Sequence, residues 1–573
     1  MRANKILLLV SSLGTLALLG FAAFGENFRQ EWRVLQRQYR AALPEEQRSD
    51  FAIQLRQIVA PELGVADRCV TCHVGMAPGE SGVEGHPAFA PHPPVVHDPS
   101  AYGCTVCHAG QGRATDSESA HGLAAHWPAP MIPRRYASAG CGSCHTHLAV
   151  PHRAELEHGA RLFERLDCLA CHAVDGRGGT LRPGGSAETL GPDLSTVGAA
   201  GTDSDALTGW YDRHLARHRG SGAGPWADSF APVAEPDRDA LGVFLGSRVG
   251  APGLIEAKAL FHSLGCRGCH RVGGVGGDDG PDLARAGERD PGQTDFTHVP
   301  GPRESPRDLS AWFAEHFRSP AAVVPGSAMP ALGLDEATID RLVLYTHSLR
   351  RPPGTEALWP RDRLSAERFG EREFATDGAT LYGTFCAACH GPVGQGMRFA
   401  GMPAFPAIAS PDFLRAAPDE LLRATIERGR PGRRMPAWGQ LEGGLRPEEI
   451  DTLVSYLREL GGQPAVADPR PHRFVAADPD SLAAGERLYG AICASCHGAA
   501  GEGGEGPALD NKVLLEAATD GYLVDTITTG RAGTSMPGFT RPTPLYPTLD
   551  SDQIEAIVAW IRTWEITTRE DPS

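Results

Sequence analysis

The chain has 573 residues and a formal net charge of −16, with 54 Lys and Arg against 70 Asp and Glu. This length suggests about four domains. The acidic balance argues against nucleic acid as a partner, because phosphate binding needs a basic surface. Aromatic residues make up only 7% of the chain. That fraction is low for self-sufficient cores of this size, so something other than side chains is expected to fill part of them.

The N-terminus begins with two basic residues, Arg2 and Lys5, and an uncharged, mostly apolar run follows from Ile6 to Phe24. The run is just long enough to span a bilayer. Basic residues on its N-terminal side place the rest of the chain outside the cytoplasm. We favour a retained membrane anchor over residues 1–25, and a signal peptide cleaved at the weak site Ala23-Phe24-Gly25 is the alternative. Both interpretations put the following domains on the periplasmic side of a bacterial cytoplasmic membrane.

Residues 26–60 are predicted to be helical, because Trp32, Leu35, Tyr39 and Leu43 recur at intervals of three and four. Two roles for this segment remain open. It is either a stalk that lifts the following domains off the membrane or a docking helix for a membrane partner.

All 14 cysteines fall in one pattern, C-x-x-C-H, which occurs seven times. The pattern is typical of c-type haem attachment, in which both cysteines bind the porphyrin and the adjacent histidine binds its iron. A structural zinc site usually takes two Cys pairs, and a redox Cys pair does not need the histidine. Seven repeats without exception therefore favour haem c. The cysteines are Cys69, Cys72, Cys104, Cys107, Cys141, Cys144, Cys168, Cys171, Cys266, Cys269, Cys386, Cys389, Cys493 and Cys496. The proximal iron ligands are His73, His108, His145, His172, His270, His390 and His497.

Three of the seven motifs lie within residues 61–150. This segment is too short to build a separate core around each haem, so we expect a compact, loop-rich three-haem module. An iron that only carries electrons needs a second axial ligand, and the segment contains several spare histidines. We predict His92, His97 and His121 as distal ligands without assigning their partners. A surface or propionate-binding role is the alternative for each of them.

From about residue 152 the chain repeats four times. Each repeat has an opening segment with a small residue and a Leu-aromatic step, one motif, a glycine-rich loop and an apolar-periodic closing helix. The closing helices are predicted at Asp239–Leu245, Ile339–Leu349, Glu449–Leu460 and Gln553–Trp564. Domains are predicted at 151–250, 251–352, 371–462 and 480–566, with linkers rich in Pro and polar residues at 351–360 and 461–479.

These four repeats resemble class I cytochrome c domains, which are small helical folds around one covalently attached haem. The resemblance rests on the opening helix, the C-x-x-C-H motif, the Pro after the haem loop, a late Met-Pro step and the closing helix. It implies that the late methionines are distal ligands: Met329, Met435 and Met536. Met402 also precedes a Pro, but it follows its motif too soon. Residues 61–150 resemble N-terminal segments of membrane-anchored cytochromes that sit beside quinol-oxidising complexes. The predicted fold is thus mainly α: a transmembrane helix, the three-haem module and four tandem domains.

The fourth motif breaks the methionine rule, since no Met occurs between Met131 and Met329. Two histidines, His214 and His218, precede the equivalent position on a predicted helix, and either would give a bis-histidine iron. An iron with an open site and a ligand from elsewhere in the chain are the alternatives.

The resemblance implies electron transfer, with seven covalently attached haems acting as a conductor. The expected partners are membrane-embedded quinol-oxidising or oxidase subunits, a soluble electron carrier, and membrane lipid around the N-terminal helix. Electrons are expected to enter near the anchor and leave through the C-terminal domains. The alternative is a haem enzyme that reduces a small molecule, such as peroxide or a nitrogen oxide, at a vacant fourth iron.

Overall fold

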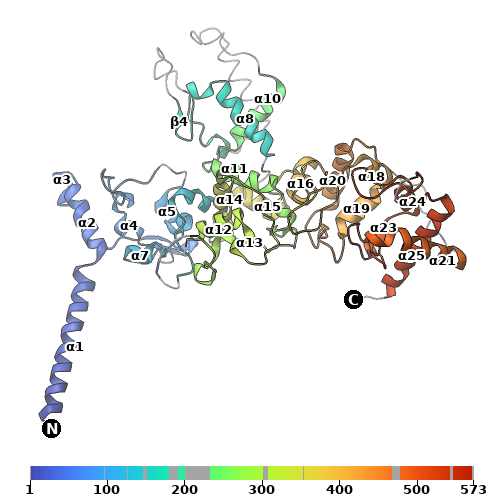
Figure 1. Ribbon diagram of the computed structural model, residues 1–573. Coiled ribbons are helices and arrows are strands. Elements are labelled where there is room, and N and C mark those ends of the chain that lie inside the picture. Colours follow the sequence, from blue (N-terminus) through green and yellow to red (C-terminus); the bar gives the residue numbers. More distant parts are fainter. Residues whose placement is uncertain are drawn as a thin grey trace, which may run out of the picture.

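The computed structural model describes residues 2–93, 95, 97–124, 127–145, 150, 152–179, 191–200, 233–300, 308–352, 354–466, 478–542 and 546–570. Over this part of the chain the protein is mainly helical, with three two-stranded antiparallel sheets. The domains form an elongated row, with the N-terminal helix at one end and the C-terminal domain at the other (Figure 1). One domain projects sideways from the middle of the row.

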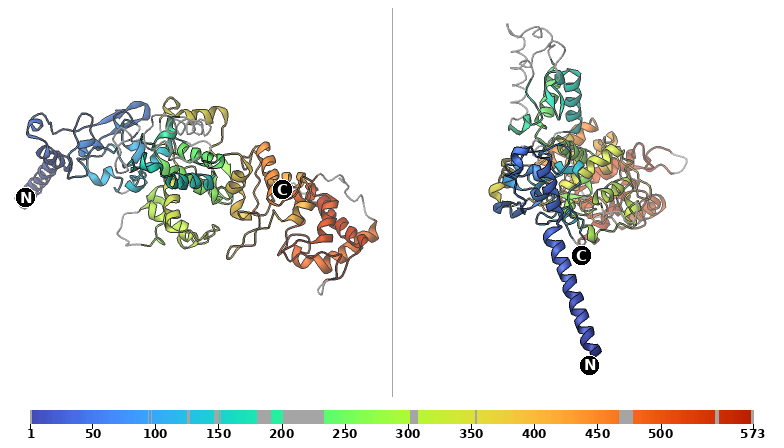
Figure 2. Two further views of the ribbon diagram at one scale, coloured as in Figure 1. Left: turned by 90° about the horizontal axis from the view of Figure 1, so that it is seen from above. Right: turned by 90° about the vertical axis from the view of Figure 1, so that its left-hand side faces the viewer.

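The first helix, α1 (Arg2–Phe28), projects away from the rest of the protein (Figure 1 and the right-hand view of Figure 2). Its segment Asn4–Gly25 has a mean hydropathy of 2.2 and none of it is buried in the protein. Within the described residues, it is the one helix long and apolar enough to cross a membrane. This helix agrees with the predicted anchor and extends slightly beyond residue 25.

The prediction of one helix over residues 26–60 is wrong. Helix α2 (Glu31–Ala42) ends before Pro44, because a proline disfavours helical geometry in the residue before it. A single turn, α3 (Glu45–Arg48), follows. Helix α2 is also no free stalk: the Gln36 Nε2 atom donates to the Thr71 carbonyl oxygen at 2.8 Å, and Tyr39 is fully buried. The helix therefore packs onto the three-haem module.

The three-haem module consists of short elements and one hairpin, in which β1 pairs antiparallel with β2. Its apolar core is small, and Tyr39, Phe51 and Phe89 form its centre. The elements are β1 (Ile58–Ala60), η1 (Pro61–Leu63), β2 (Val65–Asp67), α4 (Cys69–Cys72), η2 (Val74–Met76), α5 (Pro99–Tyr102), α6 (Thr105–His108), α7 (Ser117–Ala120) and η3 (Arg134–Ser143).

The next domain contains the fourth motif and projects from the row (Figure 1). Its elements are α8 (Arg153–Arg165), η4 (Cys168–Ala170), β3 (Ala173–Val174), β4 (Arg177–Gly178), η6 (Val197–Ala200) and α10 (Glu235–Gly246). The two candidate distal ligands of this domain, His214 and His218, lie outside the described residues.

The domain with the fifth motif occupies the middle of the row. Its elements are α11 (Pro252–Ser263), η8 (Cys266–Gly268), β5 (Arg271–Val272), β6 (Val275–Gly276), η9 (Ala286–Glu288), η10 (Pro291–Gln293), α12 (Leu309–Arg318), α13 (Pro320–Val323) and α14 (Glu336–Ser348). Two short helices, η11 (Glu356–Leu358) and α15 (Arg361–Phe369), lead to the next domain.

The last two domains share one continuous apolar core. The sixth-motif domain contains α16 (Gly378–Phe385), α17 (Ala387–His390), α18 (Pro411–Ala416), α19 (Asp419–Arg428) and α20 (Pro447–Leu460). The seventh contains α21 (Pro479–Leu488), η12 (Tyr489–Cys493), α22 (Ala494–His497), α23 (Lys512–Ala517), α24 (Asp520–Thr529) and α25 (Ser551–Glu570).

In all four repeats the opening helix packs against the closing helix: α8 on α10, α11 on α14, α16 on α20 and α21 on α25. The four closing helices were predicted from sequence and are present. The small residue in each opening segment explains the close approach. A Cβ atom on Gly159 would collide with the Ala240 carbonyl, and one on Gly485 with the Ala556 carbonyl. Glycine at these positions lets the two helix backbones touch.

Candidate haem sites

In the four repeats, each proximal histidine is oriented by the same hydrogen bond. The imidazole Nδ1 atom lies 2.8 to 2.9 Å from a proline carbonyl oxygen, which only accepts, so Nδ1 carries the hydrogen and Nε2 keeps its lone pair. Such a bond is the usual way in which a protein fixes the tautomer and the orientation of a metal-binding histidine. The pairs are His172 with Pro192, His270 with Pro281, His390 with Pro406 and His497 with Pro507.

The residue before this proline is a glycine in three of the repeats, because the loop presses against the imidazole. A Cβ atom at Gly280 would lie 2.5 Å from Cε1 of His270, and one at Gly506 would lie 2.7 Å from Cε1 of His497. Gly191 is similarly close to His172. The Gly-Pro step thus holds the ring from one side while its carbonyl orients it.

The three-haem module brings three pairs of histidine rings close to each other. The ring centres are 6.4 Å apart for His73 and His121, 6.1 Å for His108 and His92, and 6.1 Å for His145 and His97. Metal–imidazole bonds of about 2 Å on opposite sides of one ion place the two ring centres about 6 Å apart. Each pair could therefore hold one metal ion between its two rings.

The surroundings of one histidine in each pair favour its neutral form. Burial lowers the pKa of His73, and the neighbouring His121 lowers it further. Burial and then His92 lower the pKa of His108, and burial and then His145 lower that of His97. A neutral imidazole is the form that binds a metal ion.

Two of the predicted methionines occupy equivalent loops in the sixth and seventh repeats. Arg430 N donates to the Met435 carbonyl at 2.9 Å, and Arg531 N donates to the Met536 carbonyl at 2.9 Å. Both side chains are partly buried against the shared core, which also includes Cys386 and Cys493. The sequence argument against Met402 agrees with its surroundings, since its sulfur accepts a hydrogen bond from Arg434 at 3.1 Å.

The fifth repeat contains a histidine that sequence reasoning missed. His316 stacks on Trp312 with ring centres 4.9 Å apart, and its buried Nδ1 atom has no hydrogen-bond partner. Burial lowers its pKa to about 4, with smaller contributions from His270 and Arg289. The ring thus lies near the proximal ligand His270. A signal was available, because Trp210 and His214 in the fourth repeat have the same spacing.

Asp67 is a second residue that the sequence did not single out. Its carboxylate is 1% exposed and accepts hydrogen bonds from Cys104 N at 2.6 Å and from Thr105 N at 2.7 Å. It lies just before the first motif and caps the turn of the second. Asp67 therefore fixes two haem-attachment turns relative to each other.

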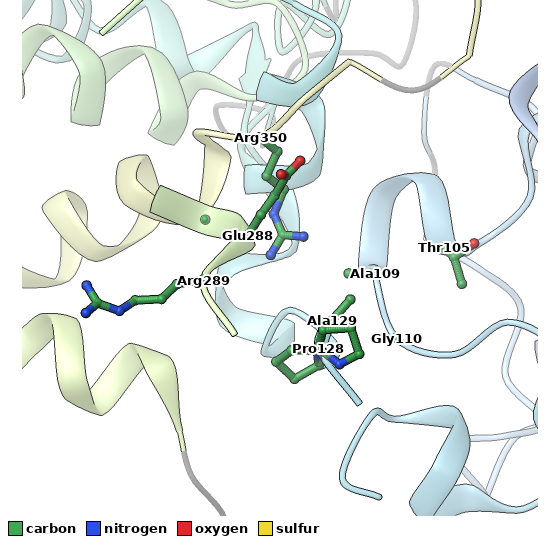
Figure 3. Close-up of a pocket in the computed structure, with 10 residues that line it drawn as sticks. Thr105, Ala109, Gly110, Pro128, Ala129, Glu288, Arg289 and Arg350 are labelled. Carbon is green, nitrogen blue, oxygen red and sulfur yellow. The ribbon is translucent and has the colours of Figure 1, made fainter. Parts of the chain in front are cut away.

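A cavity of about 360 Å³ separates the second motif from the fifth-motif domain. Thr105 and Ala109 lie on one side, and Glu288 and Arg350 face them from the other (Figure 3). The three-haem module and the fifth-motif domain therefore share an interface that their separation in the chain does not indicate.

Comparison with known proteins finds similarities from residue 254 onward. Residues 254–350 match the family model described as "Cytochrome c", and residues 373–457 and 480–561 match "Cytochrome C oxidase, cbb3-type, subunit III". One relative is the "Cbb3-type cytochrome c oxidase subunit FixP" of Bradyrhizobium sp. (strain ORS 278), 32% identical over 27% of this chain and 51% of that protein. Another is the "Cbb3-type cytochrome c oxidase subunit CcoP" of Azospirillum sp. (strain B510), 31% identical over 32% of this chain and 60% of that protein.

The chain thus spans between half and three fifths of the length of these relatives. The matches support a c-type cytochrome with covalently bound haem iron, and electron transfer in a respiratory chain. They cover the last three of the four repeats that the sequence predicted.

Proposed function

We propose that this chain is a membrane-anchored c-type cytochrome with seven covalently bound haems, which carries electrons from a quinol-oxidising complex to a soluble carrier or a terminal oxidase. The main support for the proposal is the environment of the histidine in each of the seven motifs. Three proximal histidines face a second histidine, and four are oriented by a proline carbonyl. A haem iron with two protein ligands gains and loses one electron without an open position for substrate.

The distal ligands follow from these positions. His121, His92 and His97 serve the first, second and third haems in that order, as their opposed rings suggest. Met329, Met435 and Met536 serve the fifth, sixth and seventh haems, supported by the family resemblance and by the matching loops around Met435 and Met536. The protein supplies ligand type and burial, and these set the potential at each site.

The distribution of ligands along the chain suggests a direction. Methionine raises the reduction potential of a haem relative to a second histidine. The opposed histidine pairs lie next to the anchor helix and the methionines lie in the C-terminal domains (Figure 1). Electrons therefore enter near the membrane and leave at the far end of the row.

The partner at that far end is a terminal oxidase or its electron donor. The matched relatives are named as subunits of cbb3-type oxidases, and the last two repeats match the family model of subunit III of these oxidases. Helix α1 supports attachment to the bacterial cytoplasmic membrane, with the haem domains on the periplasmic side.

A redox titration of the purified full-length protein, followed by optical and electron paramagnetic resonance (EPR) spectra, tests the proposal. We expect seven centres, with lower potentials for the bis-histidine group than for the methionine group. A mature protein without covalent haem in its mass spectrum, or potentials that fall from the N-terminal to the C-terminal sites, would contradict it.

Single substitutions test the ligand assignment. His121→Ala should convert one low-spin haem to high spin, because the first iron loses its second imidazole. His86→Ala is the matched control, since the His86 Nδ1 atom accepts a hydrogen bond from Ala88 N at 3.2 Å and the ring packs on Phe89. A low-spin spectrum in the His121 variant would refute the assignment.

The competing function is reduction of a small molecule at the fourth haem. It rests on the absence of a methionine between Met131 and Met329. A high-spin ferric signal in the wild-type protein that disappears in a Cys168→Ser, Cys171→Ser variant would favour an enzyme. Low-spin signals throughout would favour electron transfer alone.

A further inference from the structure

The order in which the seven motifs contact one another in space differs from their order in the chain at the fourth motif. The first contact joins motifs one and two, where the sulfur atoms of Cys69 and Cys104 lie within 4.8 Å of each other. Asp67, just before the first motif, accepts hydrogen bonds from the turn of the second. The first two haem-attachment turns therefore touch directly.

The second and third motifs are equally close. A Cβ atom on Gly140, just before the third motif, would collide with the backbone of Cys107 in the second motif. Helix α6 and the 3-10 segment η3, which carry these motifs, are in contact.

The third motif contacts the domain of the fifth motif, although the fourth motif is the next one in the chain. Cys141 and Cys266 pack against the same apolar cluster, whose buried members include Leu254 and Phe261. A Cβ atom on Gly142 would lie 2.6 Å from the Cβ atom of Ser348. The third attachment turn thus rests on helices α11 and α14 of the fifth-motif domain.

The remaining links follow the row. The η8 turn of the fifth motif contacts helix α17 of the sixth, and a Cβ atom on Gly265, just before the fifth motif, would lie 2.7 Å from Ala388 N. Cys386 and Cys493 of the sixth and seventh motifs border one shared core.

The fourth motif belongs to a separate cluster. Cys168 packs against buried residues of its own domain and against Ala259 of helix α11. The domain joins the row through α11, where Arg248 pairs with Glu256 at 3.1 Å. Cys171 is exposed, whereas the other cysteines are partly buried. Figure 1 shows α8 and α10 projecting away from the row.

We propose that the haem sites form a line in the order one, two, three, five, six, seven, and that the fourth site is a side branch attached at the fifth. This inference rests on the proposed function. The rate of electron transfer between two haems falls steeply with their separation. Electrons that cross the whole protein therefore pass between the motifs that lie closest together. The fourth site exchanges electrons with the line but is not needed to complete it.

Two matched variants of the full-length protein test the branch. Cys168→Ser with Cys171→Ser removes haem attachment at the fourth site, and Cys266→Ser with Cys269→Ser removes it at the fifth. Mass spectrometry checks that each variant lacks one haem. In the EPR difference spectrum of the oxidised protein, loss of the fourth haem should remove one signal and leave the others unchanged. Loss of the fifth should also alter signals of its neighbours, because magnetic coupling to them disappears.

Kinetics provide the second measurement. A photoreductant attached to an added cysteine at the exposed residue Ser117 would inject electrons beside the first motifs. The rate at which the injected electrons reduce the methionine-ligated haems should be unchanged in the variant without the fourth haem. In the variant without the fifth haem, this reduction should be lost. Equal losses in both variants would overturn the branch. A wild-type protein that transfers no electrons along the row would instead contradict the proposed function, while the EPR pattern would still report the order of sites.

If the fourth-site variant does not accumulate, the wild-type protein supplies the test. One low-spin ferric signal should show slower spin relaxation than the others, because its haem has no touching neighbour. Uniform relaxation of all signals would overturn the proposal.

Discussion

Glu373 joins the fifth and sixth haem domains, and its neutralisation should loosen that junction. The carboxylate accepts a hydrogen bond from Lys258 Nζ at 2.8 Å and pairs with Arg267. Arg267 lies between the two cysteines of the fifth motif and is 1% exposed, whereas Lys258 is 4% and Glu373 25% exposed. One carboxylate thus pairs with two buried cations across the domain boundary.

Glu373→Gln leaves both cations without their shared anion. Removing one partner of a buried ion pair costs about 3–5 kcal/mol, and the partial exposure of Glu373 places the expected loss near 3 kcal/mol, the lower end of that range. For a unit of about 200 residues, each kcal/mol shifts the melting temperature by about 2–4 °C, so we expect a decrease of about 6–12 °C. Calorimetry of the haem-loaded protein measures this shift.

Glu336→Gln is the matched control, because Glu336 pairs with Arg318 but is 76% exposed. An exposed pair contributes less than about 1 kcal/mol. Burial alone would raise the pKa of Glu373, but Lys258 and Arg267 lower it well below its ordinary value. Its stabilising effect is therefore complete above the unfolded pKa of about 4.3 and is lost as the pH falls below that value. A Glu373 variant that melts like wild type at pH 7 would refute this account.

Three further predictions concern the haem sites themselves. Met435→His should lower the potential of one haem by a substantial part of the roughly 0.8 V range that axial ligands span, whereas Met402→Leu should leave every potential unchanged; a redox titration compares them. Gly506→Ala should reduce haem attachment at the seventh motif, because the new Cβ would lie 2.7 Å from the His497 ring; normal haem content by mass spectrometry would contradict it. Asp67→Asn should destabilise the three-haem module by about 1.5–3 kcal/mol, the contribution of a hydrogen bond to a charged group, and limited proteolysis should show faster cleavage within residues 61–150.

The chemistry of each site could be predicted from the sequence because its main parts are contiguous. Two cysteines and a histidine occupy five consecutive positions, and the porphyrin demands that spacing. The closing helices were also predictable, since an apolar stripe at helical intervals has to face the opening helix. The single helix over residues 26–60 was not correct, because Pro44 and the contacts of Gln36 with the module override the apolar periodicity.

The pairing of histidines could not be read from the sequence. His92 lies before its partner His108, whereas His121 lies after its partner His73, so no fixed spacing marks a ligand pair. His316 and Asp67 were missed for a related reason: His316 lies near His270 and Asp67 hydrogen-bonds to the turn of the second motif, and both partners are dozens of residues away in the chain.

Covalent haem attachment depends on a few consecutive residues, so the sequence alone determined that the protein binds haem through thioethers. Hydropathy is also a local property, and it determined that the N-terminal segment is apolar enough to cross a membrane. The order in which the motifs touch was decided by tertiary packing. Cys141 packs against the cluster around Cys266 because helices α11 and α14 pack onto the three-haem module. The fourth-motif domain, which lies between these two units in the chain, projects to the side (Figure 1). Contacts between distant segments depend on how the helices pack, and the order of segments in the chain does not determine that packing.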